Sequence, residues 1–273
     1  MTDSVTRLAA FTCGLLGLRG IEVLAPDHAP TSPLGSRWLT NLGLGLVNGL
    51  VVSFAIASWF APSARTEFAA QLGLLRFLGL SGWTRLLLEV ILLDLGTYLL
   101  HRGYHVVPVL WRLHVVHHSD LDLDVSSASR FHTGEVLVSS ILKIGAVVLL
   151  GISPLGLVVF ETLMLACAQF QHANIRLPSR LETGLWWTVV PPAMHRIHHT
   201  PTREDTNSNY GTILTVWDWL FRTLRRRPPS SVASFGVETL RDPRSLGLAR
   251  LLLLPTTLPR DPGVERSGPS TKC

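Results

Sequence analysis

Charged residues are scarce in this sequence. Asp, Glu, Lys and Arg make up 16% of its 273 residues, whereas soluble domains usually carry about a quarter. The mean hydropathy is correspondingly positive, at +0.32. This composition excludes a disordered chain and argues against a globule that meets water on every side. Lysine is the rarest charged type, because Lys143 and Lys272 are the only lysines among 24 basic residues.

Cysteine is too rare to build a site, and several cofactor motifs are absent. Cys13, Cys167 and Cys273 lie far apart and are odd in number, which excludes a disulfide framework, a zinc knuckle and an iron–sulfur cluster. The absence of H-E-x-x-H excludes the zinc-peptidase arrangement, and that of G-x-G-x-x-G and H-P-G-G excludes a nicotinamide or haem site of those kinds. The E-x-x-H pairs of soluble di-iron bundles are missing too.

Four long apolar runs are present instead. Residues 42–61 contain no charge and are long enough, as a helix, to cross a hydrocarbon core of about 30 Å. Residues 84–106 form a second predicted span. Residues 136–152 and 154–171 predict a helical hairpin with its turn at 151–154, where glycine and proline stand.

The other segments predict smaller elements around these spans. Residues 8–25 are apolar but contain Arg19 and Glu22, so we expect an interfacial helix or a weak fifth span. Residues 66–79 place charges beside an apolar face, which is typical of an amphipathic surface helix. Residues 259–273 are rich in Pro, Gly and Ser and predict a loose tail.

Histidine is in marked excess, and eight of the eleven histidines fall into three clusters. The clusters read His101-Arg-Gly-Tyr-His105, His114-Val-Val-His117-His118 and His195-Arg-Ile-His198-His199. Positions i, i+3 and i+4 share one face of a helix, so the spacing predicts that each cluster points its imidazoles in one direction. The first cluster ends the predicted span at 84–106 and the second begins soon after it, which puts both near one membrane surface.

So many imidazoles repel one another on protonation unless something binds them. Neutral imidazole suits zinc, copper, iron and nickel, and one tetrahedral zinc needs only four ligands, so the clusters imply two metal ions. Two classes fit: an enzyme for oxygen chemistry on a lipid, or a membrane metal-binding or metal-transport protein without redox chemistry. The second class usually places ligands at mid-membrane along a path. These clusters lie at span ends or in polar segments, which favours the enzyme.

The order of the motifs resembles a known family. H-R-x-x-H, H-x-x-H-H-S, Q-H-x-N, H-R-x-H-H, N-Y-G and W-D-x-L-F follow one another from about Asp94 to Thr223, nearly half the chain. This order is similar to that of the fatty acid hydroxylase/sterol desaturase superfamily of integral membrane di-iron oxidoreductases. The resemblance implies two iron ions that activate O2, as co-substrate, to hydroxylate or desaturate an unactivated C–H bond of a fatty acyl or sterol-like lipid.

The resemblance also implies a ligand set. The expected iron ligands are the eight clustered histidines and the histidine of Gln-His-Ala-Asn: His101, His105, His114, His117, His118, His172, His195, His198 and His199. Some relatives carry one more histidine four residues before the position of His172, where this chain has Ala168. The role of His132 is left open between a metal ligand, a residue that supports a ligand and an interfacial residue. His28, which has no partner motif, is expected to bind nothing.

We therefore expect an all-α, multi-pass membrane bundle of about four spans with a histidine-rich, metal-binding cap on the cytoplasmic side. Residues 1–83 would form N-terminal membrane and interfacial helices, 84–227 the di-iron catalytic domain and 228–273 a C-terminal tail. The electrons would come from a separate ferredoxin- or cytochrome-like protein, docked at the arginines of 222–227. Beside membrane spans, such a basic block marks the cytoplasmic face rather than a nucleic-acid site.

Charged residues near the clusters leave alternatives open. Asp94, inside a predicted span, needs an interior partner: either a ligand imidazole that it orients, or a basic side chain. Lys143 must pair, snorkel or face the interior. The run Asp120, Asp122 and Asp124 is expected to form a solvated face.

Overall fold

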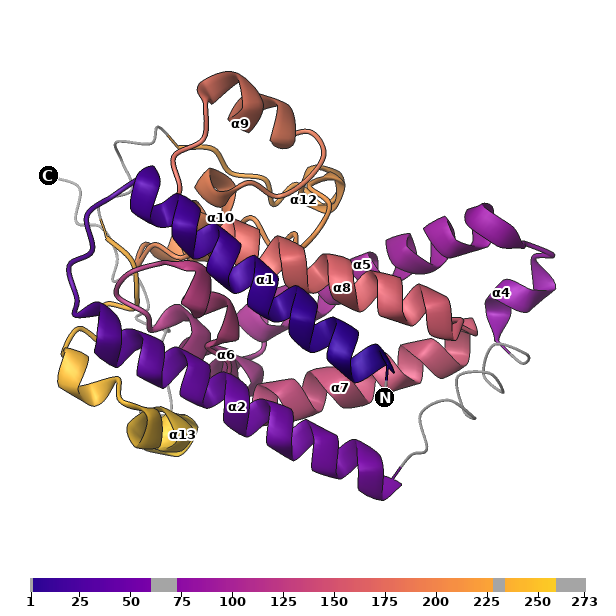
Figure 1. The fold of residues 1–273 in the computed structure, drawn as a ribbon, viewed down its shortest axis with the longest axis horizontal. Helices are drawn as coiled ribbons and strands as arrows, with labels where there is room; N and C mark the ends of the chain where they lie inside the picture. Colours follow the sequence, from indigo (N-terminus) through magenta and orange to yellow (C-terminus); the bar gives the residue numbers. More distant parts are fainter. Residues whose placement is uncertain (1, 60–72, 228–233, 259–273) are drawn as a thin grey trace, which may run out of the picture.

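Long helices make up most of the chain (Figure 1). The computed structural model describes residues 2–59, 73–227 and 234–258. Within these ranges every regular element is a helix, apart from one isolated antiparallel bridge between Val189 and Leu214. The all-α class predicted from the sequence is therefore confirmed for the part of the chain that the structure describes.

Within the described ranges, six helices of eleven residues or more form the body of the molecule together with several short ones. The longer helices are α1 (Thr2–Leu24), α2 (Leu34–Trp59), α5 (Gly82–Val106), α6 (Pro108–His118), α7 (Thr133–Leu150) and α8 (Pro154–His172). The shorter ones are α4 (Leu74–Phe77), α9 (Ser179–Leu185), α10 (Pro192–His198), α11 (Arg203–Thr206), α12 (Val216–Leu220) and α13 (Leu248–Thr257), with the 3-10 helices η1 (Val125–Ser129) and η3 (Pro243–Ser245). Figure 1 shows α4 at one end of the bundle and α6 and α10 toward the other.

In the α7–α8 hairpin, α7 ends and α8 begins where the sequence predicts the turn. Gly151 ends α7 in the left-handed region, with a φ of 74° that glycine adopts without a steric cost. Pro154 occupies the first turn of α8, and the Ser153 hydroxyl accepts a hydrogen bond from the Gly156 N–H at 3.0 Å. Glu89 of α5 holds this turn by accepting from the Ser153 N–H at 2.9 Å.

Lys143 of α7 pairs across the hairpin with Glu161 of α8. Pairing was one of the three possibilities that its apolar surroundings left open. The contact compensates a basic group that would otherwise be expensive in a membrane.

Two of the predicted spans are apolar and long enough to cross a membrane: α7 and α8. The predicted span at 84–106 lies in α5, which carries Glu89, Asp94 and Arg102 and is not apolar enough to join them. The predicted span at 42–61 runs past the end of α2 into residues outside the described ranges. The count of about four spans therefore stays a prediction.

Residues 234–258 pack against the bundle and do not form a loose tail. Leu251 and Leu254 of α13 are buried against Leu44 of α2 and Val115 of α6, and Leu251 is 0% exposed. Part of the predicted C-terminal tail at 228–273 thus belongs to the core, because α13 covers the helix that carries the second histidine cluster. The loose tail predicted at 259–273 and the first half of the surface helix predicted at 66–79, residues 66–72, lie outside the described residues. The described half contains the short helix α4.

Candidate metal centre

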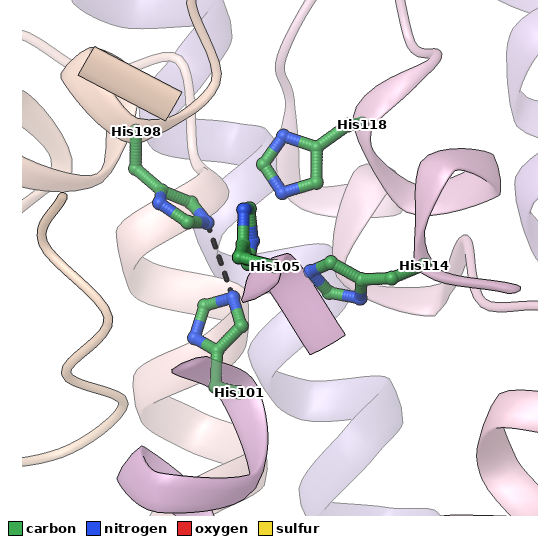
Figure 2. A group of neighbouring side chains, drawn as sticks. All are labelled: His101, His105, His114, His118 and His198. Carbon is green, nitrogen blue, oxygen red and sulfur yellow. Dashed lines mark hydrogen bonds between the residues drawn. The ribbon is translucent and has the colours of Figure 1, made fainter. Parts of the chain in front are cut away.

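Nine histidines from α5, α6, α8 and the end of α10 meet in two groups. The first group holds His101, His105, His114, His118 and His198, and the second holds His117, His172, His195 and His199. Within each group one ring nitrogen of every residue lies within 4.8 Å of those of the others. Figure 2 shows the five rings of the first group turned toward one another. These are the nine histidines that the sequence nominated, whereas His28 and His132 belong to neither group.

Each H-x-x-H-H motif is divided between the two groups. His114 and His118 join the first group, while His117, between them in sequence, joins the second. Four residues turn a helix by about +40° and three by about −60°, so the middle histidine points away from the outer pair. The prediction that each cluster points in one direction is therefore wrong for these two motifs. Each motif instead contributes histidines to both groups. The rings of His118, in the first group, and His199, in the second, stack with centroids 4.4 Å apart.

Backbone carbonyls fix the orientation of two rings in the first group. His101 Nδ1 lies 2.8 Å from the Tyr210 carbonyl oxygen, and His198 Nδ1 lies 2.7 Å from that of Ser208. A carbonyl only accepts, so both Nδ1 atoms carry the proton and each neutral ring presents a lone pair at Nε2. These two Nε2 atoms lie 3.1 Å apart. Two lone pairs at this distance repel unless a cation binds both.

The second group repeats the arrangement. His117 Nδ1 lies 3.2 Å from the Arg130 carbonyl oxygen and His172 Nδ1 lies 2.7 Å from that of Ala168. Their Nε2 atoms are 3.2 Å apart. Nitrogen ligands at about 2.1 Å from one ion lie about 3.0–3.4 Å from each other. The donor sets of both groups therefore fit a metal ion.

Other ring nitrogens in the two groups are buried without a hydrogen-bond partner. These are both nitrogens of His105, Nε2 of His114 and His118, and Nδ1 of His195 and His199. Burial lowers the pKa of His118 and His199 well below the ordinary value, and it lowers the pKa of His198 to about 3. The rings of His118, His198 and His199 are therefore neutral near pH 7, which is the form that binds a metal.

Glu135 is a supporting residue that the sequence reasoning missed. It lies in the first turn of α7, and its carboxylate oxygen is 2.7 Å from His114 Nδ1. The carboxylate accepts the Nδ1 proton, which leaves His114 Nε2 as a lone pair facing the first group. Carboxylates in this role orient a ligand ring and raise its basicity. Glu135 stands three residues after His132 in the sequence, but nothing in the spacing of the motifs connects it with His114.

Replacing Glu135 tests this support. We expect Glu135→Leu to weaken the binding of a divalent transition metal by about 10–100-fold, because His114 loses the acceptor that fixes its tautomer. Glu135→Gln is the matched control, since its amide oxygen can still accept the Nδ1 proton, and its effect should be the smaller. Competition titration against a chelator measures both. Equal metal affinity in the native protein and in Glu135→Leu would contradict the role.

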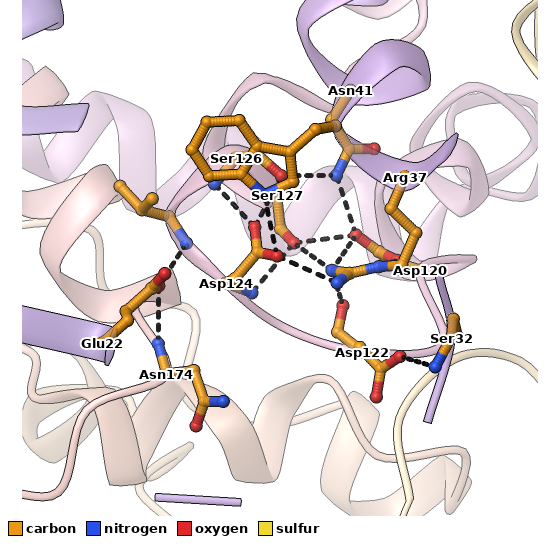
Figure 3. A network of polar contacts seen from close by, with 12 residues as sticks. Glu22, Ser32, Arg37, Asn41, Asp120, Asp122, Asp124, Ser126, Ser127 and Asn174 are labelled. Atoms are coloured by element: carbon orange, nitrogen blue, oxygen red, sulfur yellow. Dashed lines mark hydrogen bonds and ion pairs between the residues drawn. The ribbon is translucent and has the colours of Figure 1, made fainter. Parts of the chain in front are cut away.

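The acidic residues that follow His118 are buried, so the prediction that they form a solvated face is wrong. Asp120, Asp122 and Asp124 are at most 4% exposed. The Arg37 guanidinium of α2 donates to Asp120 and to Asp124, each at 2.9 Å (Figure 3). Burial alone would raise the pKa of Asp120, but Arg37 and Arg130 hold it well below its ordinary value. The network fixes the segment that leads from His118 to Arg130.

Asp94 has an interior partner, but neither of those expected. Its carboxylate accepts from the backbone N–H groups of Ile213 and Leu214, both at 3.1 Å, and from the Trp217 indole N–H at 2.7 Å. It therefore orients no imidazole and pairs with no basic side chain. It holds the segment before α12 against α5.

The arginine block at 222–227 is partly compensated. Arg225 and Arg227 both contact Asp205, at 2.5 and 3.0 Å. The Arg226 guanidinium lies 5.1 Å from the ring centre of Trp186. These contacts reduce the uncompensated positive charge at 222–227, where the sequence predicted that an electron carrier docks.

Arg222 carries backbone strain. Its φ is 57°, in the left-handed region, and the side chain is exposed. That conformation costs an L residue about 1 kcal/mol or more, and glycine adopts it freely. We expect Arg222→Gly to raise the free energy of unfolding in detergent by about 1 kcal/mol. Arg222→Ala is the control and should give no such gain, because it retains Cβ; an equal gain in both variants would contradict the strain.

Two groups of buried and half-buried histidines that could each hold a metal ion lie together in a helical bundle. The sequence model of the fatty acid hydroxylase family, described as "Fatty acid hydroxylase", matches residues 86–223, just over half of the chain. This chain belongs to that family, as the order of its motifs predicted. No solved structure matches it.

Several curated proteins are similar to this chain. The ornithine lipid hydroxylase of Rhizobium tropici is 31% identical over 155 residues, which cover 56% of this chain and 45% of the relative. The alkylglycerol monooxygenase of Homo sapiens is 29% identical over 137 residues, covering 48% of this chain and 28% of the relative. That of Danio rerio is 29% identical over 151 residues, covering 53% and 31%. The chain thus spans less than half the length of these relatives.

Proposed function

We propose that this chain is an O2-dependent di-iron lipid hydroxylase embedded in a membrane. The observation that carries the proposal is the pair of histidine groups, in each of which two ring lone pairs face each other at hydrogen-bond distance. In this proposal one ion is held by His101, His105, His114, His118 and His198, and the other by His117, His172, His195 and His199. The family and the names of the similar proteins support a lipid as the substrate.

Iron supports this chemistry better than the other metals that imidazole suits, because family and ligands point to oxidation of a lipid. The two bound irons would supply the redox centre for O2 activation and attack on an unactivated C–H bond. The protein's own part is to hold the rings neutral, to orient them through carbonyls and Glu135, and to exclude water by burying them. Hydroxylation is favoured over desaturation because the similar proteins are named hydroxylase and monooxygenase.

The histidine end of the bundle would face the cytoplasm. The ligands at the end of α5 and the end of α8 lie together with those of α6 and α10, so all nine belong to one end of the α7–α8 hairpin. A cytoplasmic position gives access to the separate ferredoxin- or cytochrome-like protein that would deliver two electrons for each turnover. Apolar side chains of the spans would line the path of the lipid chain.

Metal, oxygen and lipid analysis together test the function. The chain purified in detergent from iron-replete cells should hold about two irons, because nine imidazoles exceed the needs of one ion. With a reductant it should consume O2, and lipids from producing cells should contain species that have gained one oxygen atom. A single zinc at full occupancy would contradict the di-iron site. Metal binding without O2 uptake would indicate a binding or transport protein, and loss of two hydrogens instead of a gain of oxygen would indicate a desaturase.

A further inference from the structure

Exposed apolar side chains gather on α9, on α12 and beside them. Trp187 is 60% exposed, Trp219 44% and Leu220 64%. The two tryptophan rings stack with centroids 4.8 Å apart, although they are far apart in sequence. Figure 1 shows α9 projecting from one side of the bundle with α12 near it. The set, called the tryptophan flank below, is Leu181, Trp187, Val216, Trp219, Leu220 and Phe221.

The tryptophan flank lies alongside the bundle rather than beyond its end. Asp94, which holds the segment before α12, precedes His101 by seven residues, or about 10 Å along a helix axis. Ile213 packs in the same cluster as Leu93 of α5 and Phe160 of α8. The segment at 213–221 therefore contacts the apolar middle of the helices, on the side of the histidines that faces the α7–α8 turn.

Protein groups satisfy backbone N–H donors at 210–215, so these donors need no water. The segment is not helical before α12, so its N–H groups need partners from elsewhere. The Asp218 carboxylate accepts from the N–H groups of Tyr210 and Gly211, at 2.9 and 2.8 Å. The Asp94 carboxylate accepts from the N–H groups of Ile213 and Leu214, and the Thr188 carbonyl accepts from that of Thr215. Non-helical backbone at membrane depth is tolerated only where protein groups satisfy it in this way.

We infer that the tryptophan flank is inserted into the lipid bilayer, so that α12 lies among acyl chains beside α5. The inference rests on the membrane location proposed above, but not on iron or on turnover. The one carboxylate of α12, Asp218, is 0% exposed, so the outer face of this helix is apolar. Arg226 lies 5.5 Å from the ring centre of Trp187, and an arginine beside tryptophans suits the headgroup level of a bilayer with anionic lipids.

The rival occupant is a soluble protein partner such as the electron carrier. An acidic carrier would meet exposed charge on its docking surface. Here Arg225 and Arg227 share Asp205, and Arg226 lies against Trp186 and Trp187. Arg222 is exposed beside the tryptophan flank, but the other exposed side chains of 216–222 are aromatic and aliphatic. The lipid bilayer is therefore the occupant that the surface fits.

Spin labels in nanodiscs test the insertion. The full chain, with its three cysteines replaced by alanine, carries one nitroxide at Leu220→Cys or Val216→Cys in a bilayer of phosphatidylcholine and phosphatidylglycerol. Ile141→Cys, at a position 67% exposed in the middle of α7, is the control for a membrane span. Arg244→Cys is the control for water, because that side chain is 89% exposed on η3.

We expect both α12 labels to collide with O2 and to lose their collisions with a water-soluble nickel chelate, as the Ile141 label does. Chelate collisions equal to those at Arg244 would overturn the insertion and leave the surface free for a protein partner. If the nickel chelate reached the Ile141 label as well as the α12 labels, both the insertion of α12 and the membrane location of the chain would be overturned. A shielded Leu220 label in a chain without O2 uptake would leave the insertion standing and contradict only the proposed enzyme.

Should the cysteine-free chain not fold, tryptophan emission of the native chain answers the same question. Lipids brominated in the acyl chain should quench part of the emission of its eight tryptophans. Trp219→Phe and Trp187→Phe should each remove part of the quenched component, because both rings would lie at acyl-chain or interface depth. An unchanged quenched component in both variants would overturn the insertion.

Discussion

His172→Ala is expected to abolish turnover and to lower the bound iron from about two ions per chain to about one. The second group has only four histidines, so it would be left with three. His172 Nε2 lies 3.2 Å from His117 Nε2 and 3.0 Å from His195 Nε2, which places it between two other members. Loss of such a ligand exceeds the effect of about 10–100-fold that is typical of an outer partner. Metal analysis and O2 uptake measure the two losses.

His28→Ala is the matched control, because His28 lies outside both groups. Its ring packs against Phe235, with centroids 5.1 Å apart. It should keep two irons and full turnover. If His172→Ala also kept two irons and near-normal product, the second site would not depend on this histidine, and the ligand set would contain eight members.

Local sequence was sufficient to predict the parts of the fold that local chemistry determines. Gly151, Ser153 and Pro154 end one helix and begin the next through their own conformational preferences. The histidine motifs identified the residues that gather at one end of the bundle, although the prediction that each motif points in one direction was wrong. Helix geometry separates the two adjacent histidines of each H-x-x-H-H motif by about 100°. Which other histidines each member meets depends on the packing on either side of α6 and α10.

The partners of the buried carboxylates depend on contacts that are distant in sequence. Asp94 bonds to the backbone at 213–214, and Asp120 bonds to Arg37 of α2. A run such as D-L-D-L-D has the composition of a solvated face, and nothing in its spacing shows that an arginine more than eighty residues earlier covers it. Glu135 was missed for the same reason, because its acceptor role exists only once α7 packs against α6.

Arg37→Leu is expected to lower the free energy of unfolding by about 3–5 kcal/mol, because it removes the guanidinium that pairs with two buried carboxylates. The side chains of Arg37 and Asp120 are 8% and 2% exposed, and Asp124 shares the same guanidinium. Denaturation in detergent measures the loss. Arg244→Leu is the matched control: its pair with Asp242 is exposed, at 89% and 52%, so solvent screens it and its loss should have little effect on stability.

A second substitution separates lost charge compensation from lost packing. In the Arg37→Leu background, Asp120→Asn removes one uncompensated charge and should recover part of the lost stability, whereas a packing defect at Arg37 would not respond to it. The effect should also reach the metal centre. The network holds the segment that ends at Arg130, whose carbonyl oxygen lies 3.2 Å from His117 Nδ1. Arg37→Leu should therefore release metal from the second group at a lower temperature than Arg244→Leu does. A loss of stability below about 1 kcal/mol, as for an exposed pair, would contradict the buried network.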